Sequence, residues 1–194
     1  MVSLSGVTPD ATTTTKGKIQ LAGDLAGTSA LPVIGTNKVT FDKANTGFVI
    51  QQVGTQFGAV GTTTTPIPVD DTIPQITEGA EFMTQTITPL SATSRLYVEV
   101  TATISASIAT HLQAALFRDA TANAIAVSVI YQNTATGIVT ITFSHVATSG
   151  STSATTFRVR CGADAAGTLT FNGAGGTRRY GGITLSSMTI TEIK

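Results

Sequence analysis

Charged side chains are scarce in this chain of 194 residues, and their scarcity excludes whole classes of partner. Asp, Glu, Lys and Arg make up 11% of the residues, against about a quarter in typical soluble domains. Acidic and basic residues are equal in number, so the formal net charge is zero. Binding to DNA, RNA or an acidic membrane surface needs a basic patch or stripe. We therefore expect no nucleic-acid partner.

Long apolar runs and a secretory signal are also missing. No stretch of about 18 consecutive apolar residues occurs, so the sequence predicts no membrane-spanning helix and no membrane insertion. Residues 1–6 lack the basic region and the apolar region of a signal peptide. We expect a protein that is made in a cytoplasm and leaves it only through assembly or lysis.

Cysteine is reduced to one residue, Cys161, which excludes an internal disulfide framework and a thiolate zinc site. This residue follows Phe157 and Val159 at the two-residue spacing of a strand. A catalytic thiol needs an activating base nearby, and nothing in the sequence supplies one. We predict that Cys161 is a small buried hydrophobic residue.

Histidine occurs only twice, at His111 and His145. Metal sites need three or four converging ligands, so each histidine is predicted to be half-buried in a strand rather than to bind a metal. The glycine-rich segment 173–176 precedes no helical pattern and lacks the Lys-Ser/Thr pair of a phosphate-binding loop, so it is predicted to form a hairpin turn. The sequence predicts no metal and no cofactor.

The few acidic residues do not form an evident catalytic pair. Asp70 and Asp71 are adjacent, so their side chains point apart in an extended chain. Asp119 and Asp164 lie in predicted turns, where Asp commonly bonds its own backbone. Two carboxylates that converge across the fold could still serve a glycan-hydrolysing enzyme, which stays the least favoured alternative. No catalytic residue is predicted.

Threonine replaces the missing charge, at about one residue in five, and short alternating runs fill the chain from Phe48 onward. In residues 95–106, six apolar side chains including Leu96, Val98, Val100 and Ile104 fall on one face, which indicates a long strand with one buried side. The further predicted strands are 48–53, 82–88, 112–117, 124–131, 138–146, 155–161, 168–171 and 183–193. Gly, Pro, Asn and Asp separate them, and no helical pattern intervenes. The sequence predicts an all-β fold, an antiparallel β-sandwich of the jelly-roll kind, with an extended surface loop over 62–78.

Residues 1–47 differ from the rest in having only isolated apolar residues among Gly, Thr, Ser, Asp and Lys. These residues are too sparse to form a core alone, so we expect an N-terminal arm followed by a head at 48–194. A disordered tail is the simpler alternative. The regular spacing of the apolar residues favours an extended arm that becomes ordered when it binds.

Residues 11–22 carry the pattern Ala-Thr-x-Thr-x-x-Gly-x-Ile-x-Leu-Ala, in which β-branched residues favour extended chain. This dodecamer resembles the short repeat of bacteriophage tail-fibre shafts. Segments of the head, including 68–75, 114–124, 171–176 and 181–193, resemble a C-terminal module of phage virion proteins. The resemblance implies a compact β-sandwich head that trimerises, and it implies no chemistry.

These features predict a non-enzymatic bacteriophage virion protein, a short tail fibre or receptor-binding tip. Ile19, Leu21 and Leu25 are the predicted attachment residues. The expected partners are two further copies of the chain, other virion proteins of the tail, baseplate or capsid, and a glycan of the host surface. A capsid head fibre or decoration (cement) protein is the main alternative, because it follows the same sequence pattern.

Arg178, Arg179 and Tyr180 form the one compact cluster of basic and aromatic residues. Arg and Tyr are enriched at binding surfaces, so the cluster is a candidate contact for a glycan or for another subunit. The alternative is that these residues simply cap strand ends at a turn.

Overall fold

The structure is a computed structural model, and it describes residues 25–27, 32–34, 46–164 and 166–194. Contacts divide the chain into two units, Met1–Asn45 and Thr46–Lys194. In the first unit, β1 (Leu25–Gly27) pairs antiparallel with β2 (Pro32–Ile34), and Leu25 lies opposite Ile34. Within the described residues, no helix has the length and apolar character needed to cross a membrane.

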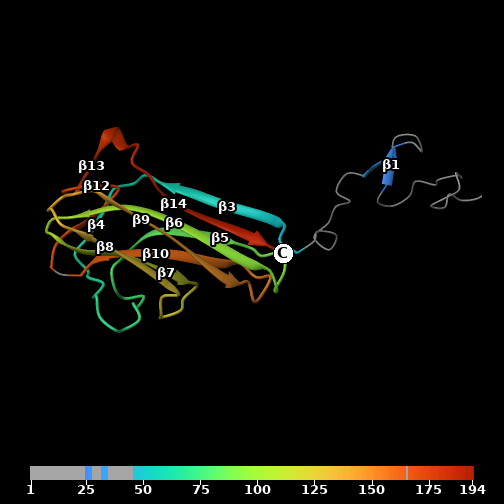
Figure 1. The fold of residues 1–194 in the computed structure, drawn as a ribbon, viewed down its shortest axis with the longest axis horizontal. Helices are drawn as coiled ribbons and strands as arrows, with labels where there is room; N and C mark the ends of the chain where they lie inside the picture. The colour runs from blue at the N-terminus through green and yellow to red at the C-terminus, as the bar shows by residue number, and fades with distance from the viewer. Residues whose placement is uncertain (1–24, 28–31, 35–45, 165) are drawn as a thin grey trace, which may run out of the picture. The chain divides into compact units, whose positions relative to one another are not determined.

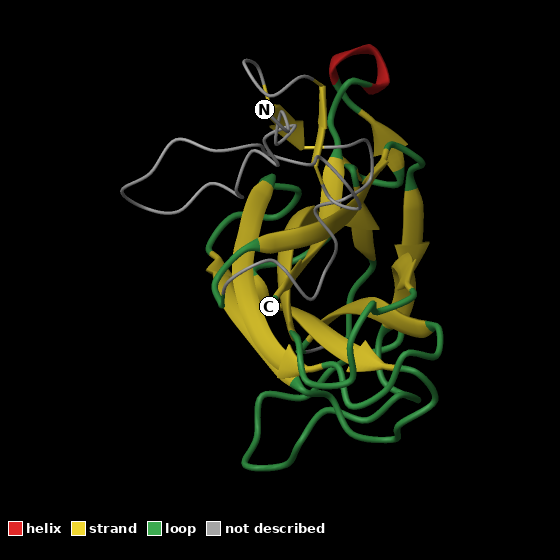
Figure 2. Cartoon of the chain, turned by 90° about the vertical axis from the view of Figure 1, so that its right-hand side faces the viewer, coloured by secondary structure: helices red, strands yellow, loops and turns green. Residues whose placement is uncertain are grey.

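The second unit, which we call the head, is an antiparallel β-sandwich, as the sequence predicts (Figures 1 and 2). One sheet has six strands: β3 (Val49–Phe57), β14 (Ser186–Ile193), β6 (Arg95–Ala106), β11 (Leu169–Phe171), β4 (Gly61–Thr63) and β9 (Val139–Thr148). The other sheet has four: β5 (Ala80–Ile87), β10 (Thr155–Ala163), β7 (Thr110–Arg118) and β8 (Ala126–Gln132). A small hairpin joins β12 (Gly173–Ala174) to β13 (Thr177–Arg178), and the 3-10 turn η2 (Tyr180–Gly182) follows it.

Strand β6 lies at the centre of the larger sheet, where it pairs with β14, β11 and β9. Leu96, Val98, Val100 and Ile104 are completely buried, while Glu99 on the opposite face is exposed. The strand has the predicted bounds, and β9 pairs with it along Arg95–Ile104 on the side opposite to β14 and β11. The predicted core of this strand is confirmed.

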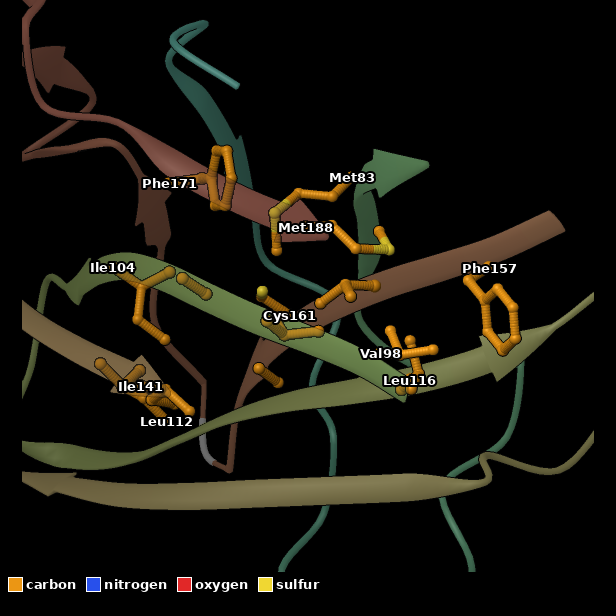
Figure 3. Packing of buried hydrophobic residues seen from close by; sticks show 14 of the residues in the cluster. Met83, Val98, Ile104, Leu112, Leu116, Ile141, Phe157, Cys161, Phe171 and Met188 are labelled. Carbon is orange, nitrogen blue, oxygen red and sulfur yellow. The ribbon is translucent and has the colours of Figure 1, made fainter. Parts of the chain in front are cut away.

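The core fills the space between the two sheets (Figure 3). Strand β6 contributes Val98 and Ile104, and β7 contributes Leu116 from the opposite sheet. Phe157 and Cys161 on β10 are also fully buried, so the prediction that Cys161 is a buried hydrophobic residue is confirmed. Burying one such side chain stabilises the fold by about 1.5–3 kcal/mol.

Residues 64–79, which we call the strap, follow β4 and cover the outer face of the four-stranded sheet. Ile67 is buried there against Ala115 and Phe117, and its backbone N–H donates to the carbonyl of Ala163 at 3.0 Å. The prediction of a surface loop over 62–78 is therefore right for the strap. It is wrong for its first residues, since Thr62 lies in β4 and pairs with β11.

The predicted hairpin at 173–176 is present as β12 and β13. Its turn residues, Gly175 and Gly176, both have positive φ, at 60° and 75°. A two-residue hairpin turn needs this left-handed backbone, which glycine adopts without steric cost.

The sandwich has two distinct ends. At the first, which we call the arm pole, the chain enters the head, and the Gly47 N–H donates to the carbonyl of Lys194 at 2.6 Å. At the second, β3 ends opposite the start of β14, where Phe57 pairs with Ser186. We call this second end, formed by residues 57–61 and 172–185, the distal pole. In Figure 1 the C-terminus marks the arm pole, and β12 and β13 lie at the other end of the head.

Candidate binding surface at the distal pole

The most exposed aromatic residue of the distal pole is held in an unusual backbone conformation. Tyr180 has a φ of 50° and is 78% exposed, and Gly181 and Gly182 follow with φ of 66° and 89°. A non-glycine residue in the left-handed region costs on the order of 1 kcal/mol. The turn, red in Figure 2, thus holds the tyrosine ring out to solvent on a strained backbone. Such strain is a recognised mark of functional segments.

Two arginines precede this tyrosine, and both are exposed. Arg179 Nη1 donates to Thr177 Oγ1 at 3.1 Å. The guanidinium of Arg178 lies over Gly182, where a Cβ added to this glycine would lie 3.2 Å from Nη1. Among the described residues, neither arginine forms an ion pair. Ion pairs of the head join Asp164 to His111, Asp119 to Arg118 and Glu81 to Arg158. Both guanidinium groups are therefore available to an external anion.

A shallow cavity of about 370 Å³ opens at the same pole, beside the loop that joins β3 to β4. The residues that line it are Phe57, Gly58, Ala59, Val60, Gly61, Glu81, Phe82 and Phe171. The rings of Phe82 and Phe171 stack with centroids 4.8 Å apart. Leu185 connects the cavity to the loop of Tyr180, since its Cδ2 lies 3.0 Å from the position of a Cβ on Gly58.

A β-bulge places Phe82 in this cavity. Val159 on β10 pairs with Met83, and the next residue, Arg160, pairs with Glu81, so Phe82 has no partner across the strands. A bulge bends the strand locally and changes the direction of its side chains. Here it places the phenylalanine ring against a ring from the other sheet, and no sequence signal announces it.

Asn172 holds the two segments of the distal pole together. It is buried, has a φ of 56°, and its Nδ2 donates to the carbonyl of Phe57 at 2.6 Å and to that of Ala59 at 3.2 Å. Its Oδ1 accepts a hydrogen bond from the Ser186 hydroxyl at 2.7 Å. The Asn172-Gly173 pair at the end of a strand is a turn signal, but the sequence does not predict the long-range hydrogen bonds of Asn172.

The structure describes four of the six predicted site residues. Arg178, Arg179 and Tyr180 lie together on the exposed loop of the distal pole. Ile19 and Leu21 lie outside the described residues, and Leu25 begins β1. The structure therefore shows that Arg178, Arg179 and Tyr180 form one exposed surface. The role of Ile19, Leu21 and Leu25 in attachment stays a prediction from the sequence.

The residues considered for catalysis or metal binding have other environments. The predicted half-burial of both histidines is confirmed: His111 packs against the Tyr131 ring at 4.9 Å, and His145 lies on the inward side of β9. Burial raises the pKa of the Cys161 thiol to about 12, which keeps it protonated. In the part of the chain that the structure describes, no group of three or more His, Cys, Asp or Glu residues could hold a metal ion.

The acidic turn residues bond to distant backbone instead of their own. Asp119 Oδ1 accepts a hydrogen bond from the Thr156 N–H at 2.8 Å, and Asp164 Oδ1 accepts one from the Val69 N–H at 2.9 Å. Asp70, by contrast, follows the expected local pattern. Hydrogen bonds from the hydroxyl and the backbone N–H of Thr72 hold its pKa below the ordinary value.

Glu192 is the buried carboxylate of the head, and no sequence signal predicts its role. It lies near the arm pole at the end of β14, with none of its surface exposed. Burial acts to raise its pKa, but the hydrogen bonds that the carboxylate accepts outweigh this, so the pKa lies below the ordinary 4.5. The donors are Ser94 Oγ, Gln51 Nε2, and the backbone N–H groups of Leu90 and Ser91. An ionised and fully bonded carboxylate is a structural anchor, not a proton donor.

Comparison with known proteins identifies a family model and a viral protein that are each similar to part of this chain. A family model described as a repeat of unknown function (DUF5907) matches residues 9–79, just over a third of the chain. The match spans β3, β4 and the strap and ends at Gly79. The Uncharacterized protein 443R of Invertebrate iridescent virus 6 is 41% identical over 61 residues, which are 31% of this chain and 2% of that protein.

Similar solved structures are distant in sequence. The sugar-binding C-terminal domain of EclA is 17% identical over 70% of this chain and 76% of that one, with a TM-score of 0.31. A structure of the infectious bursal disease virus Gx strain is 12% identical over 84% and 43%, with a TM-score of 0.37. Tailspike protein 4 of Bacteriophage CBA120 is 18% identical over 63% and 19%, with a TM-score of 0.25. At these TM-scores the likenesses carry no inference about function.

Proposed function

We propose that this protein is a non-enzymatic structural protein of a bacteriophage virion, a short tail fibre or receptor-binding tip. Residues 1–47 attach it to tail or baseplate proteins, and the head points away from the particle as part of a homotrimer. The distal pole then faces the host cell.

The polarity of the head carries this proposal. The chain enters the head at the arm pole, beside its C-terminus, and the exposed loop of Arg178, Arg179 and Tyr180 lies at the distal pole. A protein that joins a particle at one end and binds a target at the other needs this separation. The shaft-type pattern of residues 11–22 lies within the matched repeat at 9–79, and one protein that is similar to part of this chain is a viral protein.

The chemistry of the described side chains supports a binding role over a catalytic one. Glu192 is fixed by hydrogen bonds in the interior, and Asp119 and Asp164 hold backbone N–H groups. Glu81, the acid beside the cavity, lies 3.5 Å from the Arg158 guanidinium. Glycan hydrolysis needs two carboxylates that face each other across a bound sugar, and these acids are engaged at separate places in the head.

Deletion of the arm tests the proposal. Virions are produced with only residues 48–194 available, purified, and probed with an antibody against the head. We expect the truncated protein to be soluble and folded, with the circular dichroism of a β-protein, and to be absent from the particles. Since the arm has too few apolar residues to stabilise itself, its removal should leave the head intact.

Point variants sharpen this experiment. Ile19→Ser with Leu21→Ser should abolish incorporation, whereas Gln20→Ser, a change at the polar residue between them in the sequence, should leave it unchanged. Gold-labelled antibody on intact particles then locates the protein. Label at the tail supports the proposal, and label spread over the shell shows a decoration protein instead. Normal incorporation of the truncated head would show that attachment runs through the sandwich.

A further inference from the structure

We propose that the distal pole binds an acidic polysaccharide through its carboxylate groups, with Arg178 and Arg179 as the anion-binding residues and Tyr180 as the contact for a sugar ring. This inference rests on the proposed function, because it identifies the class of target that a host-facing tip would bind. It names a polyuronate, a chain of sugars that carry carboxylates, as the chemical class.

Charge distribution points to an anionic ligand. The head as a whole is slightly acidic, with seven Lys and Arg against eight Asp and Glu in residues 46–194. Within residues 57–61 and 172–185, the charged side chains are Arg178 and Arg179 alone. A local double positive charge on a nearly neutral surface attracts anions to this end. Arginine binds carboxylates with two parallel hydrogen bonds, which gives direction as well as attraction.

The shape of the loop points to a sugar. Tyr180 and Ile183 are 78% and 79% exposed, and Leu185 is 41% exposed, so the arginines stand beside an apolar surface on one short loop. A pyranose ring has an apolar C–H face that packs against an aromatic ring, and its hydroxyl groups bond to the tyrosine hydroxyl. A simple inorganic anion would use the arginines but would not require this apolar surface.

The surroundings of the loop keep it in position for binding. Asn172 ties the start of the 172–185 segment to residues 57–59, and Leu185 packs beside Gly58 at its other end. The cavity lined by Phe82 and Phe171 opens beside this second contact. A polymer bound across the loop can therefore place a neighbouring sugar in the cavity. The cavity volume of about 370 Å³ lies within the range of small-molecule binding sites.

Binding to immobilised polymers tests the inference with the full-length protein. The probes are alginate and polygalacturonate as polyuronates, dextran as a neutral polysaccharide, and polyaspartate as a carboxylate polymer without sugar rings. We expect saturable binding to at least one polyuronate, weakening as NaCl is raised, and no binding to dextran. Arg178→Gln and Arg179→Gln should each lower the affinity about tenfold, the loss of one charge-assisted contact.

Matched variants separate the surface from general charge effects. Tyr180→Gly suits the left-handed backbone, so the head should keep its melting temperature while its affinity falls about tenfold. Arg95→Gln removes an exposed arginine near the arm pole and should change nothing. Equal binding of polyaspartate and alginate, unchanged affinity in the arginine variants, or no binding to either polyuronate would each overturn the inference. Since purified protein is used, the result is independent of whether the arm attaches the protein to virions.

Discussion

At the scale of single residues, Glu192 shows how hydrogen-bond donors accommodate a buried charge. It lies on the inward side of β14 together with Met188 and Ile190, where alternation calls for an apolar residue. Its carboxylate instead accepts hydrogen bonds from the turn that follows β5, at Leu90 and Ser91, and so fixes that turn to the end of the larger sheet. Charge-assisted hydrogen bonds of this kind contribute more than neutral ones.

We expect Glu192→Gln to destabilise the head by on the order of 2 kcal/mol near neutral pH, because it removes the charge that these donors stabilise. The pKa of Glu192 is lowered by folding, so its contribution is complete above the ordinary value of 4.5 and is lost as the pH falls below it. Thermal unfolding measured from pH 7 to pH 3 should therefore show the wild type and the variant converging in acid. Asp71→Asn, at an exposed position of the strap, is the control. A difference in stability that stays constant with pH would contradict this account.

At the scale of elements, Ile67 is the most deeply buried side chain of the strap. Ile67 is 1% exposed and fills the space above Gly162, where a Cβ would lie 2.8 Å from the Ile67 backbone nitrogen. The strap therefore needs both the isoleucine and the glycine beneath it. Ile73, on the same segment, is 54% exposed.

Ile67→Ala should release the strap while the sandwich stays folded. The expected cost is about 2–4 kcal/mol, the range for truncating a buried isoleucine. Limited proteolysis with thermolysin should cut the variant within residues 64–79 and leave the remaining strands protected, whereas Ile73→Ala should resist cleavage as the wild type does. Equal cleavage of the two variants would show that the strap is held by its backbone hydrogen bonds instead.

At the scale of the whole molecule, the outer face of the six-stranded sheet is the feature that bears on assembly. Thr142 pairs with Thr101, so two hydroxyl side chains lie opposite each other, and Ser144 pairs with Glu99. Glu99 is the charged residue in the middle of this face. A broad face with few charges and many short polar side chains can be buried between subunits at small desolvation cost.

We predict a homotrimer in which this face lies between subunits. Light scattering on the purified chain at micromolar concentration should give three times the chain mass. Thr142→Arg places a long charged side chain on the face and should yield monomers, whereas Thr84→Arg, exposed on β5 of the other sheet, should not. A stable wild-type monomer would exclude the trimer, and trimers in both variants would place the interface elsewhere.

The sequence by itself determined the all-β class, the main strands of the head and the inward residues of β6. These follow from alternation, which is a local property of the chain, since each side chain of a strand faces the opposite way from the next. The cluster of Arg178, Arg179 and Tyr180 was likewise visible, because its residues are adjacent.

Only the tertiary structure decided how these pieces meet. Glu192 bonds to Leu90 across 102 residues, Asn172 bonds to Phe57 across 115, and the cavity at the distal pole takes its walls from three distant segments. The bulge at Phe82 arises from the register of β5 against β10. Such features depend on strand pairing between remote segments, which local side-chain pattern does not specify.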